Sequence, residues 1–473
     1  MKEIEDAKTI FERQKMNYSP AKPPSYAVRM DRLSRIEKLC RNHIQEITNA
    51  LQDDFGNRNP EWTFIADIFP QLSHVKYVKR HLKKWMKKEK ISSGILALAG
   101  QRKYIVNEPL GVVGIMSPFN APVSLAFDPA IEAIAAGNCV MIKMSESTPR
   151  TAELIRSLVD KYFEPQELAV VVGDQEVSKT FASLPWDKFF FTGSSEVGKR
   201  ILAAAADNLT PAILELGGKS PCVVLEDANI LDAAQKIGRV RQLNAGQVCI
   251  SGDYVLLPER HLEAFVDAVI EGDKAAYSSI IDNENVTSII NKDAYDRIVG
   301  YIDQAQAAGC RIVQSNPMNE ELPDPATRKI PLTIIVNPSD DLMVSQNEIF
   351  GPILSIYTYQ HLDDAIGYIN TKEKPLALYI FGRNQRLIDK VIYSTSSGGI
   401  TINDLLLHAT MAFGGVGYSG MGRYKGGIDG YKAFSNPKAV FESGIMRRFT
   451  GRFLPPFKND RLPKMIRRNV GVK

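Results

Sequence analysis

Residues 139–162 have the sequence CVMIKMSESTPRTAELIRSLVDKY, and this stretch decides the fold class. Its first five residues, Cys139 to Lys143, form an apolar run with the length of a buried strand. Thr148 supplies an N-cap and Pro149 a first-turn proline, so a helix is expected over 150–162. A strand followed by a loop and a helix is the repeating part of a βαβ unit.

The same alternation continues on both sides of this stretch. Further strands are expected at 112–116, 169–172 and 188–191, with an apolar, alanine-rich helix at 129–136. A second set begins near Ser220, with strands expected at 222–225 and 254–257 and helices at 231–243 and 261–270. The pattern predicts an α/β fold with a doubly wound parallel sheet. The Gly217-Gly218 pair between the two sets predicts a domain junction.

The flanks differ in character. Residues 1–90 are expected to be helical, because Val75, Val78, Leu82 and Trp85 recur at helical spacing with lysines on the opposite face. That basic face is interpreted as solvated, with binding to anionic lipid or nucleic acid as the alternative. Residues 91–109 carry glycines between two apolar stretches, which suggests a β-hairpin. The tail holds nine Lys/Arg against one acidic residue from Arg447 onward, typical of a solvated arm or a peripheral membrane contact.

The bulk composition excludes several classes of protein. At 473 residues the chain is expected to form two or more domains. A net charge of +4 is too mild to imply nucleic acid, and no apolar run approaches the roughly 20 residues of a membrane span. Five scattered cysteines without a CxxC pair suit a reducing cytosol, and the six histidines suggest no metal site. The charged N-terminus lacks the apolar core of a signal peptide, so a cytoplasmic location is expected.

Two segments suggest an anion- or ribose-binding site. In 190–199, FFTGSSEVGK, an apolar strand runs through a Gly-Ser turn into a helix, which presents backbone N–H groups and the positive helix end to a phosphate. Tight turn geometry explains those glycines equally well. Lys143 and Glu146 follow a strand end, where ligands of doubly wound sheets bind, and are suited to ribose hydroxyls. The alternative is a solvent-exposed loop pair.

Three further residues are candidates for covalent chemistry. Cys249 is flanked by small residues, although a lone cysteine is more often a small buried hydrophobe. A nucleophilic thiol needs a nearby base or donor, because its ordinary pKa of about 8.5 keeps it protonated at neutral pH. Glu215 ends an apolar strand, where burial would raise its pKa and suit it to general-base work; otherwise it is a partner for Lys219. The amide of Asn120, between two prolines, is suited to an oxyanion, or the residue simply forms a turn.

Together these segments resemble the aldehyde dehydrogenase superfamily, in order and spacing, from about Met30 to Val440. The matching motifs are Leu214-Glu215-Leu216-Gly217-Gly218-Lys219, Gly246-Gln247-Val248-Cys249, Phe191-Thr192-Gly193-Ser194 with Val197-Gly198, Glu348-Ile349-Phe350-Gly351-Pro352, and Phe413-Gly414-Gly415 with Ser419-Gly420. Chain length and the 413–425 stretch look more like the class 3, fatty-aldehyde and coniferyl-aldehyde group.

The resemblance implies a role for each matching position. Cys249 would attack the aldehyde, the Asn120 side chain and the Cys249 N–H would stabilise the oxyanion, and Glu215 would activate water to hydrolyse the thioester. The cofactor, NAD or NADP, would be held by Lys143 and Glu146 at the adenosine ribose and by Glu348 and Phe350 on the nicotinamide side. The remaining cofactor-binding positions it implies are Ile115, Ser117, Phe119, Gly193, Ser194 and Gly198.

The resemblance also implies a domain layout and an assembly. An NAD(P)-binding Rossmann-like domain would comprise 1–90 and 110–216, and a catalytic domain 217–410. Residues 91–109 and 411–440 would form a β oligomerisation element of a homodimer, or of a homotetramer, and 441–473 a basic tail.

Some positions depart from the family pattern and bear on substrate choice. Phe119 stands where the family usually has tryptophan, Ala412 where it has proline, and the loop at 405–411 is short and apolar. The substrate is therefore given only as an aldehyde, aromatic of the coniferyl type or medium-to-long aliphatic. A CoA-acylating or otherwise non-hydrolytic member is the alternative function, and Glu215 speaks against it. A non-catalytic binding protein would be expected to lack Cys249, Glu215 or Asn120.

Overall fold

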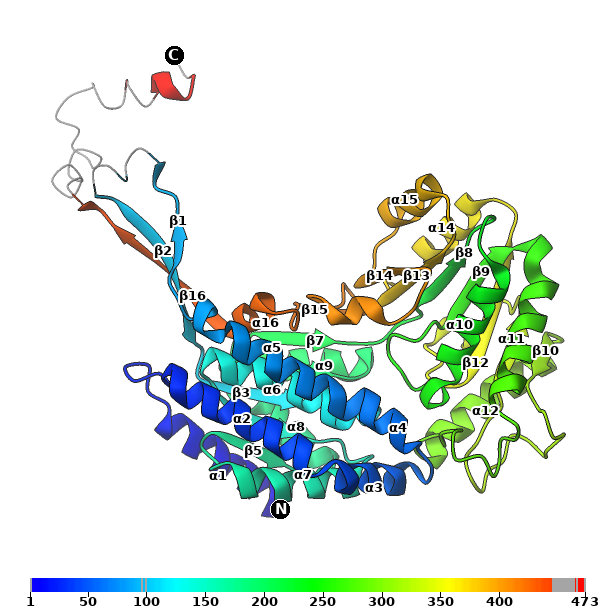
Figure 1. Ribbon diagram of the computed structural model, residues 1–473, viewed down its shortest axis with the longest axis horizontal. Helices are drawn as coiled ribbons and strands as arrows, with labels where there is room; N and C mark the ends of the chain where they lie inside the picture. Colours follow the sequence, from blue (N-terminus) through cyan, green and yellow to red (C-terminus); the bar gives the residue numbers. More distant parts are fainter. Residues whose placement is uncertain (1, 95–96, 98–99, 445–463, 465–466, 472–473) are drawn as a thin grey trace.

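The computed structural model describes residues 2–94, 97, 100–444, 464 and 467–471. Three β-sheets organise this part of the chain. Figure 1 shows two lobes, each built around one large sheet, and a narrow three-stranded sheet that projects from the first lobe. The expected α/β architecture with parallel sheets is confirmed.

The first lobe contains a six-stranded sheet in the order β15-β7-β6-β3-β4-β5, parallel except for β15. Its strands are β3 (Val112–Met116), β4 (Cys139–Lys143), β5 (Leu168–Val171), β6 (Lys188–Thr192), β7 (Ala212–Glu215) and β15 (Gly420–Met421). The first two occupy the expected residues. Side chains alternate along these strands, so the sheet contributes to a hydrophobic core on each face.

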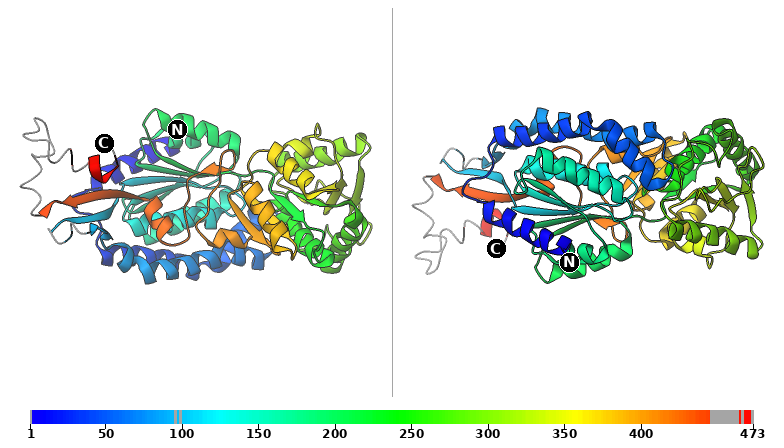
Figure 2. Two further views of the ribbon diagram at one scale, coloured as in Figure 1. Left: turned by 90° about the horizontal axis from the view of Figure 1, so that it is seen from above. Right: turned by 90° about the horizontal axis from the view of Figure 1, so that it is seen from below.

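Helices cover both faces of this sheet, as Figure 2 shows. One face carries α2 (Tyr26–Asn42), α3 (Ile44–Phe55), α4 (Pro60–Thr63), the π-helical turn η1 (Phe64–Ile68), α5 (Phe69–Trp85), α6 (Pro122–Ala136), α7 (Pro149–Tyr162) and α16 (Ile428–Ala433). The other carries α1 (Lys2–Asn17), α8 (Gln175–Ser183) and α9 (Ser195–Ala206). The helical N-terminal region is confirmed, with the four apolar residues of α5 buried as its periodicity indicated.

Two helix starts differ from the sequence expectation. Helix α6 begins at Pro122 rather than 129, because the carboxylate of Asp67 accepts from the N–H groups of Val123 and Ser124. Thr148 occupies the N-cap of α7 without a side-chain cap bond; Asp54 caps that helix instead, accepting from the N–H groups of residues 150 and 151. Both caps come from residues remote in the sequence, so local patterns did not reveal them.

The second lobe contains a seven-stranded sheet in the order β10-β11-β12-β9-β8-β13-β14, in which only the β10 edge pairs antiparallel. Its strands are β8 (Pro221–Val224), β9 (Tyr254–Pro258), β10 (Arg311–Gln314), β11 (Thr333–Val336), β12 (Ile353–Tyr359), β13 (Ala377–Phe381) and β14 (Gly399–Ile402). Its longer helices are α10 (Ile230–Gln242), α11 (Leu262–Ala276), α12 (Lys292–Ala307), α14 (Leu362–Thr371) and α15 (Gln385–Ser394). Residues 216–220, which include Gly217-Gly218, connect β7 of the six-stranded sheet to β8 of this one.

The projecting sheet consists of β1 (Glu89–Ile91), β2 (Arg102–Pro109) and β16 (Ser435–Glu442). The expected hairpin is present as the antiparallel β1–β2 pair, and β16 pairs along all of β2. Within 411–440, β15 joins the six-stranded sheet rather than this one. The oligomerisation role and the domain boundaries stay predictions. Most of the basic tail at 441–473 lies outside the described residues.

Within the described ranges, no helix is both long and apolar enough to cross a membrane. The same part of the chain contains no group of three or more His, Cys, Asp or Glu arranged to hold a metal ion.

Candidate active site

A cavity of about 1020 Å³ is lined by residues of both lobes. It collects most of the residues singled out in the sequence: Ser117, Phe119, Asn120, Lys143, Glu146, Gly193, Ser194, Glu215, Cys249, Glu348 and Phe350. Ile115 and Gly198 are not among the described lining residues. Ile115 is fully buried in the core, and a Cβ on Gly198 would lie 2.8 Å from Leu216, so that glycine lets α9 pack closely on the sheet.

The first lobe supplies its part of the lining from strand ends. Ser117 follows β3, Lys143 ends β4, Gly193 and Ser194 follow β6, and Glu215 ends β7. Because the carboxyl ends of parallel strands meet at one edge of a sheet, these residues converge although the chain separates them widely.

The turn before α9 has the geometry of an anion site. Ser194 is the N-cap in extended conformation, and its side chain accepts from the N–H of Val197 at 3.3 Å. A Cβ on Gly193 would lie 2.5 Å from the ring of Phe191, so only glycine fits. The cavity therefore faces a helix N-terminus, where the helix dipole favours negative charge.

Lys143 is buried, which excludes the solvent-exposed loop pair for this residue. Its ammonium donates to the carbonyl of Met144 at 2.7 Å and lies 3.2 Å from a carboxylate oxygen of Glu146. Burial lowers the pKa of Lys143, and the neighbouring Glu146 charge opposes this.

Cys249 lies on a loop with a strained backbone. Asn244 and Ala245 in η3 (Leu243–Gly246) both have φ of 52°, in the left-handed region that L residues avoid. Gly246 follows with φ of 71°, and a Cβ there would lie 2.2 Å from the carbonyl oxygen of Gly351. Such strain persists only where surrounding contacts fix it, and it clusters at functional sites.

The residue Cys249 is partly exposed and lines the cavity, whereas Cys40, Cys139 and Cys222 are buried in hydrophobic cores. Cys249 therefore differs from a typical lone cysteine, which is a small, buried hydrophobic residue. The pKa of the Cys249 thiol is raised well above its ordinary value by desolvation and by the charges of Glu215 and Glu348. Both effects favour the neutral thiol over the thiolate.

Glu215 is 4 % exposed, and the hydroxyl of Tyr424 donates to its carboxylate. Burial raises the pKa of Glu215, and the Tyr424 hydrogen bond and the charge of Lys425 oppose that rise. The alternative that Glu215 merely pairs with Lys219 is wrong, because Lys219 pairs with Asp253. Glu215 thus has the environment expected of a carboxylate whose pKa is shifted toward neutrality.

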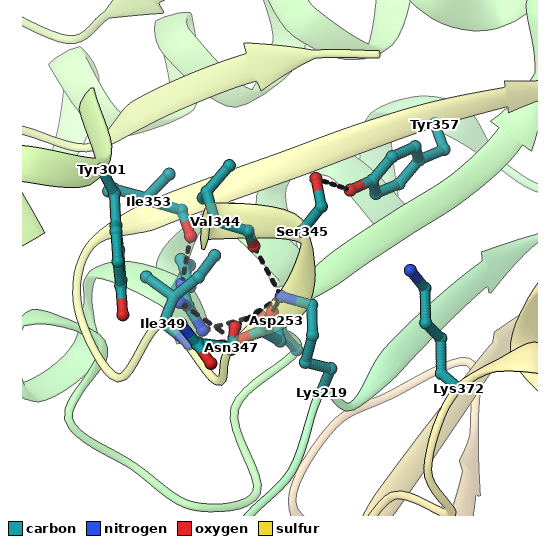
Figure 3. Close-up of polar contacts among 12 residues, drawn as sticks. Lys219, Asp253, Tyr301, Val344, Ser345, Asn347, Ile349, Ile353, Tyr357 and Lys372 are labelled. Carbon is teal, nitrogen blue, oxygen red and sulfur yellow. Dashed lines mark hydrogen bonds and ion pairs between the residues drawn. The ribbon is translucent and has the colours of Figure 1, made fainter. Parts of the chain in front are cut away.

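The loop that carries Glu348 is anchored by a buried ion pair, which Figure 3 shows. The Lys219 ammonium donates to the carbonyls of Val344 at 2.8 Å and Asn347 at 2.9 Å, as well as to Asp253. The second oxygen of Asp253 accepts from the N–H of Ile349 at 2.9 Å. The loop from Val344 to Ile349, which includes the short helix α13 (Met343–Gln346) in part, is thereby fixed at three backbone atoms.

Glu348 and Phe350 extend from this anchored loop to the cavity. Burial and the charge of Asp253 raise the pKa of Glu348 to about 8. Glu348 packs so closely on Gly217 that a Cβ there would lie 2.0 Å from its carboxylate. The rings of Phe350 and Phe119 meet edge to face with centroids 5.9 Å apart, so the two lobes touch beside the cavity.

A family model described as "Aldehyde dehydrogenase family" matches residues 2–440. The chain belongs to that family. It is 42% identical over 438 residues to a protein of Caulobacter vibrioides named "Probable coniferyl aldehyde dehydrogenase", covering 92% of this chain and 90% of that one. It is 35% identical over 443 residues to "Aldehyde dehydrogenase family 3 member H1" of Arabidopsis thaliana, covering 92% and 89%.

Among solved structures, the chain is similar to "Substrate bound state of Staphylococcus Aureus AldH", with a TM-score of 0.87 and 34% identity. That match covers 94% of this chain and 99% of the other. The resemblance to the class 3 and coniferyl-aldehyde group is therefore confirmed, and this protein is an aldehyde dehydrogenase.

Sequence reasoning missed several residues around the aldehyde dehydrogenase cavity. Tyr424 was overlooked although it lies in the recognised 413–425 stretch, and its position after a glycine-rich turn was the available signal. Arg297, Tyr301 and Lys372 line the cavity from the second lobe and belong to no motif, so only the fold brings them there.

Proposed function

We propose that this enzyme oxidises an aldehyde to the carboxylic acid through a thioester on Cys249, with NAD+ or NADP+ as hydride acceptor. The observation that carries the proposal is the convergence of Cys249, Asn120, Glu215 and Glu348 on one cavity. Family membership supports aldehyde oxidation as such; the roles of these residues and the choice of cofactor belong to the proposal.

The residues present fit a dinucleotide cofactor. The cavity, at about 1020 Å³, has the size of a large ligand site. The N-terminus of α9 at Ser194 suits a pyrophosphate, and Lys143 with Glu146 suits ribose hydroxyls. Thr192 adds a buried hydroxyl oxygen that has no partner among the described residues and lies in the cavity lining. Glu348 and Phe350 would hold the nicotinamide half, which when bound supplies the hydride acceptor.

Cys249 forms the first bond. Its thiol gives its proton to solvent water in the cavity, and the sulfur electron pair adds to the carbonyl carbon while the C=O π pair moves to oxygen. The resulting oxyanion is stabilised by N–H donors, for which the Asn120 amide and the Cys249 N–H are the available groups. Loss of hydride from this carbon then leaves an acyl group on sulfur.

Glu215 acts in the second half of the reaction. Its carboxylate removes a proton from water, the water oxygen attacks the thioester carbon, and the C–S bond breaks to release the acid and return the sulfur as thiolate. The raised pKa of Glu215 makes it a stronger base than an ordinary carboxylate, and the hydrogen bond from Tyr424 orients it. Protonated Glu215 then passes its proton to solvent.

The proposed substrates are aromatic aldehydes of the coniferyl type or medium-to-long aliphatic aldehydes. The first class takes its support from the name of the Caulobacter relative, and Phe119 adds an aromatic wall to the cavity. We further propose a homodimer, because the projecting β1-β2-β16 sheet leaves β1 and β16 as exposed edges suited to a second chain.

A substrate panel tests the proposal. Purified protein is incubated with aromatic and aliphatic aldehydes and with NAD+ or NADP+ separately, and absorbance at the reduced-nicotinamide band is followed with and without CoA. Formation of reduced cofactor with the free acid as product supports it. Turnover that depends on CoA and yields an acyl-CoA would instead establish a non-hydrolytic enzyme and remove the base role of Glu215.

A further inference from the structure

Asn120 is held through its backbone by a buried ion pair that no step of the reaction uses. Its carbonyl oxygen accepts from Nη1 of Arg58 at 3.2 Å and from Nδ2 of Asn244 at 3.3 Å. Asn244 belongs to the strained turn before Cys249, so one peptide oxygen ties the Asn120 loop to both the first lobe and the Cys249 loop.

Asp67 completes this arrangement from the opposite side. One of its oxygens accepts from Nη2 of Arg58 at 2.6 Å, and the other accepts from the N–H groups of Val123 at 3.0 Å and Ser124 at 3.1 Å. Asp67 therefore caps helix α6, whose own N-cap residue, Ala121, has no side chain able to do so. The Arg58–Asp67 ion pair therefore contacts the backbone on both sides of Ala121: Arg58 at Asn120, and Asp67 at Val123 and Ser124.

Both members of the pair are fully buried, with 0% exposure. The Arg58 guanidinium stacks on Phe55 at 4.8 Å, and Phe55 packs against Phe119, the residue before Asn120. Asp67 lies in the π-helical turn η1, a local irregularity of the kind found at functional sites. Desolvating two charges offsets most of their attraction, so stability alone is a weak reason for such a pair.

We propose that Arg58 and Asp67 are positioning residues for the oxyanion site, fixing the Asn120 backbone so that its side-chain amide meets the developing oxyanion on the substrate. The proposal rests on the proposed role of Asn120. Arg58 donates a hydrogen bond to the peptide oxygen of Asn120. Asp67 accepts hydrogen bonds from the Arg58 guanidinium and from the first N–H groups of helix α6. Neither touches the reacting atoms.

The first test uses Arg58→Lys, which keeps a cation for Asp67 but removes the second donor arm that reaches Asn120. p-Nitrophenyl acetate is the probe, because attack by the Cys249 thiolate on its carbonyl creates an oxyanion, releases p-nitrophenolate and needs no cofactor. We expect the acylation rate constant to fall roughly 100-fold, the size typical of a misplaced catalytic group, with little change in cofactor Kd.

A double-mutant comparison separates positioning from general damage. Asn120→Ala alone should slow acylation about 100- to 1000-fold, and adding Arg58→Lys should then cost little more, since the amide it positions is gone. Asp67→Asn provides a second variant if Arg58→Lys folds poorly. Glu167→Gln, which weakens partly buried ion pairs with Arg32 and Arg35 in the same lobe, is the control and should leave acylation unchanged.

Three results would overturn the inference. Full additivity of Arg58→Lys and Asn120→Ala would mean that the ion pair acts elsewhere, and wild-type acylation in both Arg58→Lys and Asp67→Asn would mean that it positions nothing. Wild-type acylation in Asn120→Ala would instead remove the oxyanion role of Asn120 itself, and with it the proposal. The second result leaves the proposed function intact, whereas the third does not.

Discussion

Replacement of Tyr424 by phenylalanine removes the single side-chain donor to Glu215 among the described residues and should shift the pH dependence of turnover. A hydrogen bond to a charged acceptor is worth about 1.5–3 kcal/mol, and one to a neutral acceptor about 0.5–1.5 kcal/mol. The difference, about 1–1.5 kcal/mol, favours the carboxylate over the acid. At 1.36 kcal/mol per pKa unit, its loss should raise the pKa of Glu215 by about one unit.

The sign of the effect follows from the role of Glu215 as a base. Only the carboxylate activates water, so hydrolysis is lost as the pH falls through the pKa, and a higher pKa moves that loss to higher pH. The acid limb of kcat should therefore shift upward by about one pH unit in Tyr424→Phe, with the two profiles converging at alkaline pH.

Stopped-flow measurement of reduced cofactor from pH 5 to 9 separates the steps, because the first-turnover burst reports hydride loss and the later linear phase reports hydrolysis. The burst should keep its amplitude in Tyr424→Phe. Tyr359→Phe, which removes a buried hydrogen bond to Val224 in the second lobe, serves as the control and should keep the wild-type profile. An acid limb that stays in place, or that moves to lower pH, would refute the reasoning.

Other contacts give further predictions. Lys219→Met should release the Glu348 loop and raise the Kd for cofactor roughly tenfold with the burst retained; isothermal titration of cofactor checks this, and unchanged affinity would contradict it. His74, between Asp128 and Glu132, has its pKa raised to about 9, so its contribution to stability, at most about 3 kcal/mol, is full below about pH 6.5 and lost as pH rises through 9. The melting temperature should therefore fall over that interval, and a decline equally steep in His74→Gln would exclude this source. The exposed lysines of α5 are interpreted as solvated, so co-sedimentation with anionic vesicles at low salt should be no greater than with neutral vesicles; salt-sensitive binding to the anionic vesicles alone would establish the membrane contact instead.

Local sequence patterns were sufficient for most strands of the first lobe and for two strands of the second, β8 and β9. The apolar runs at Val112–Met116 and Cys139–Lys143 match β3 and β4 because a buried parallel strand needs a short continuous apolar stretch. Once those strands are parallel, their carboxyl ends must share one edge. The pattern therefore predicts Lys143 at a ligand site, whereas the grouping of Glu215 with Cys249 and Asn120 follows from the family resemblance.

The contacts that tune the site could not be derived in the same way. Tyr424 and Glu215 are 209 residues apart, and Asp67 caps a helix that starts at Pro122, so no window of sequence contains either pair. The side chain of Ile115 packs in the hydrophobic core on one face of the sheet, and Ile115 is not among the described residues that line the cavity. A family resemblance identifies which residue occupies a motif position, whereas the pleat of the strand decides toward which face of the sheet its side chain points.

The thioester on Cys249 is the central claim, and intact-protein mass spectrometry tests it most directly. Glu215→Gln enzyme is mixed with aldehyde and oxidised cofactor, quenched in acid after the burst, and digested to map any adduct. The account predicts an added acyl group on the peptide that contains Cys249, in an amount equal to the reduced cofactor formed, and neither product in Cys249→Ala. Stoichiometric reduced cofactor without an acyl adduct on that peptide would contradict it.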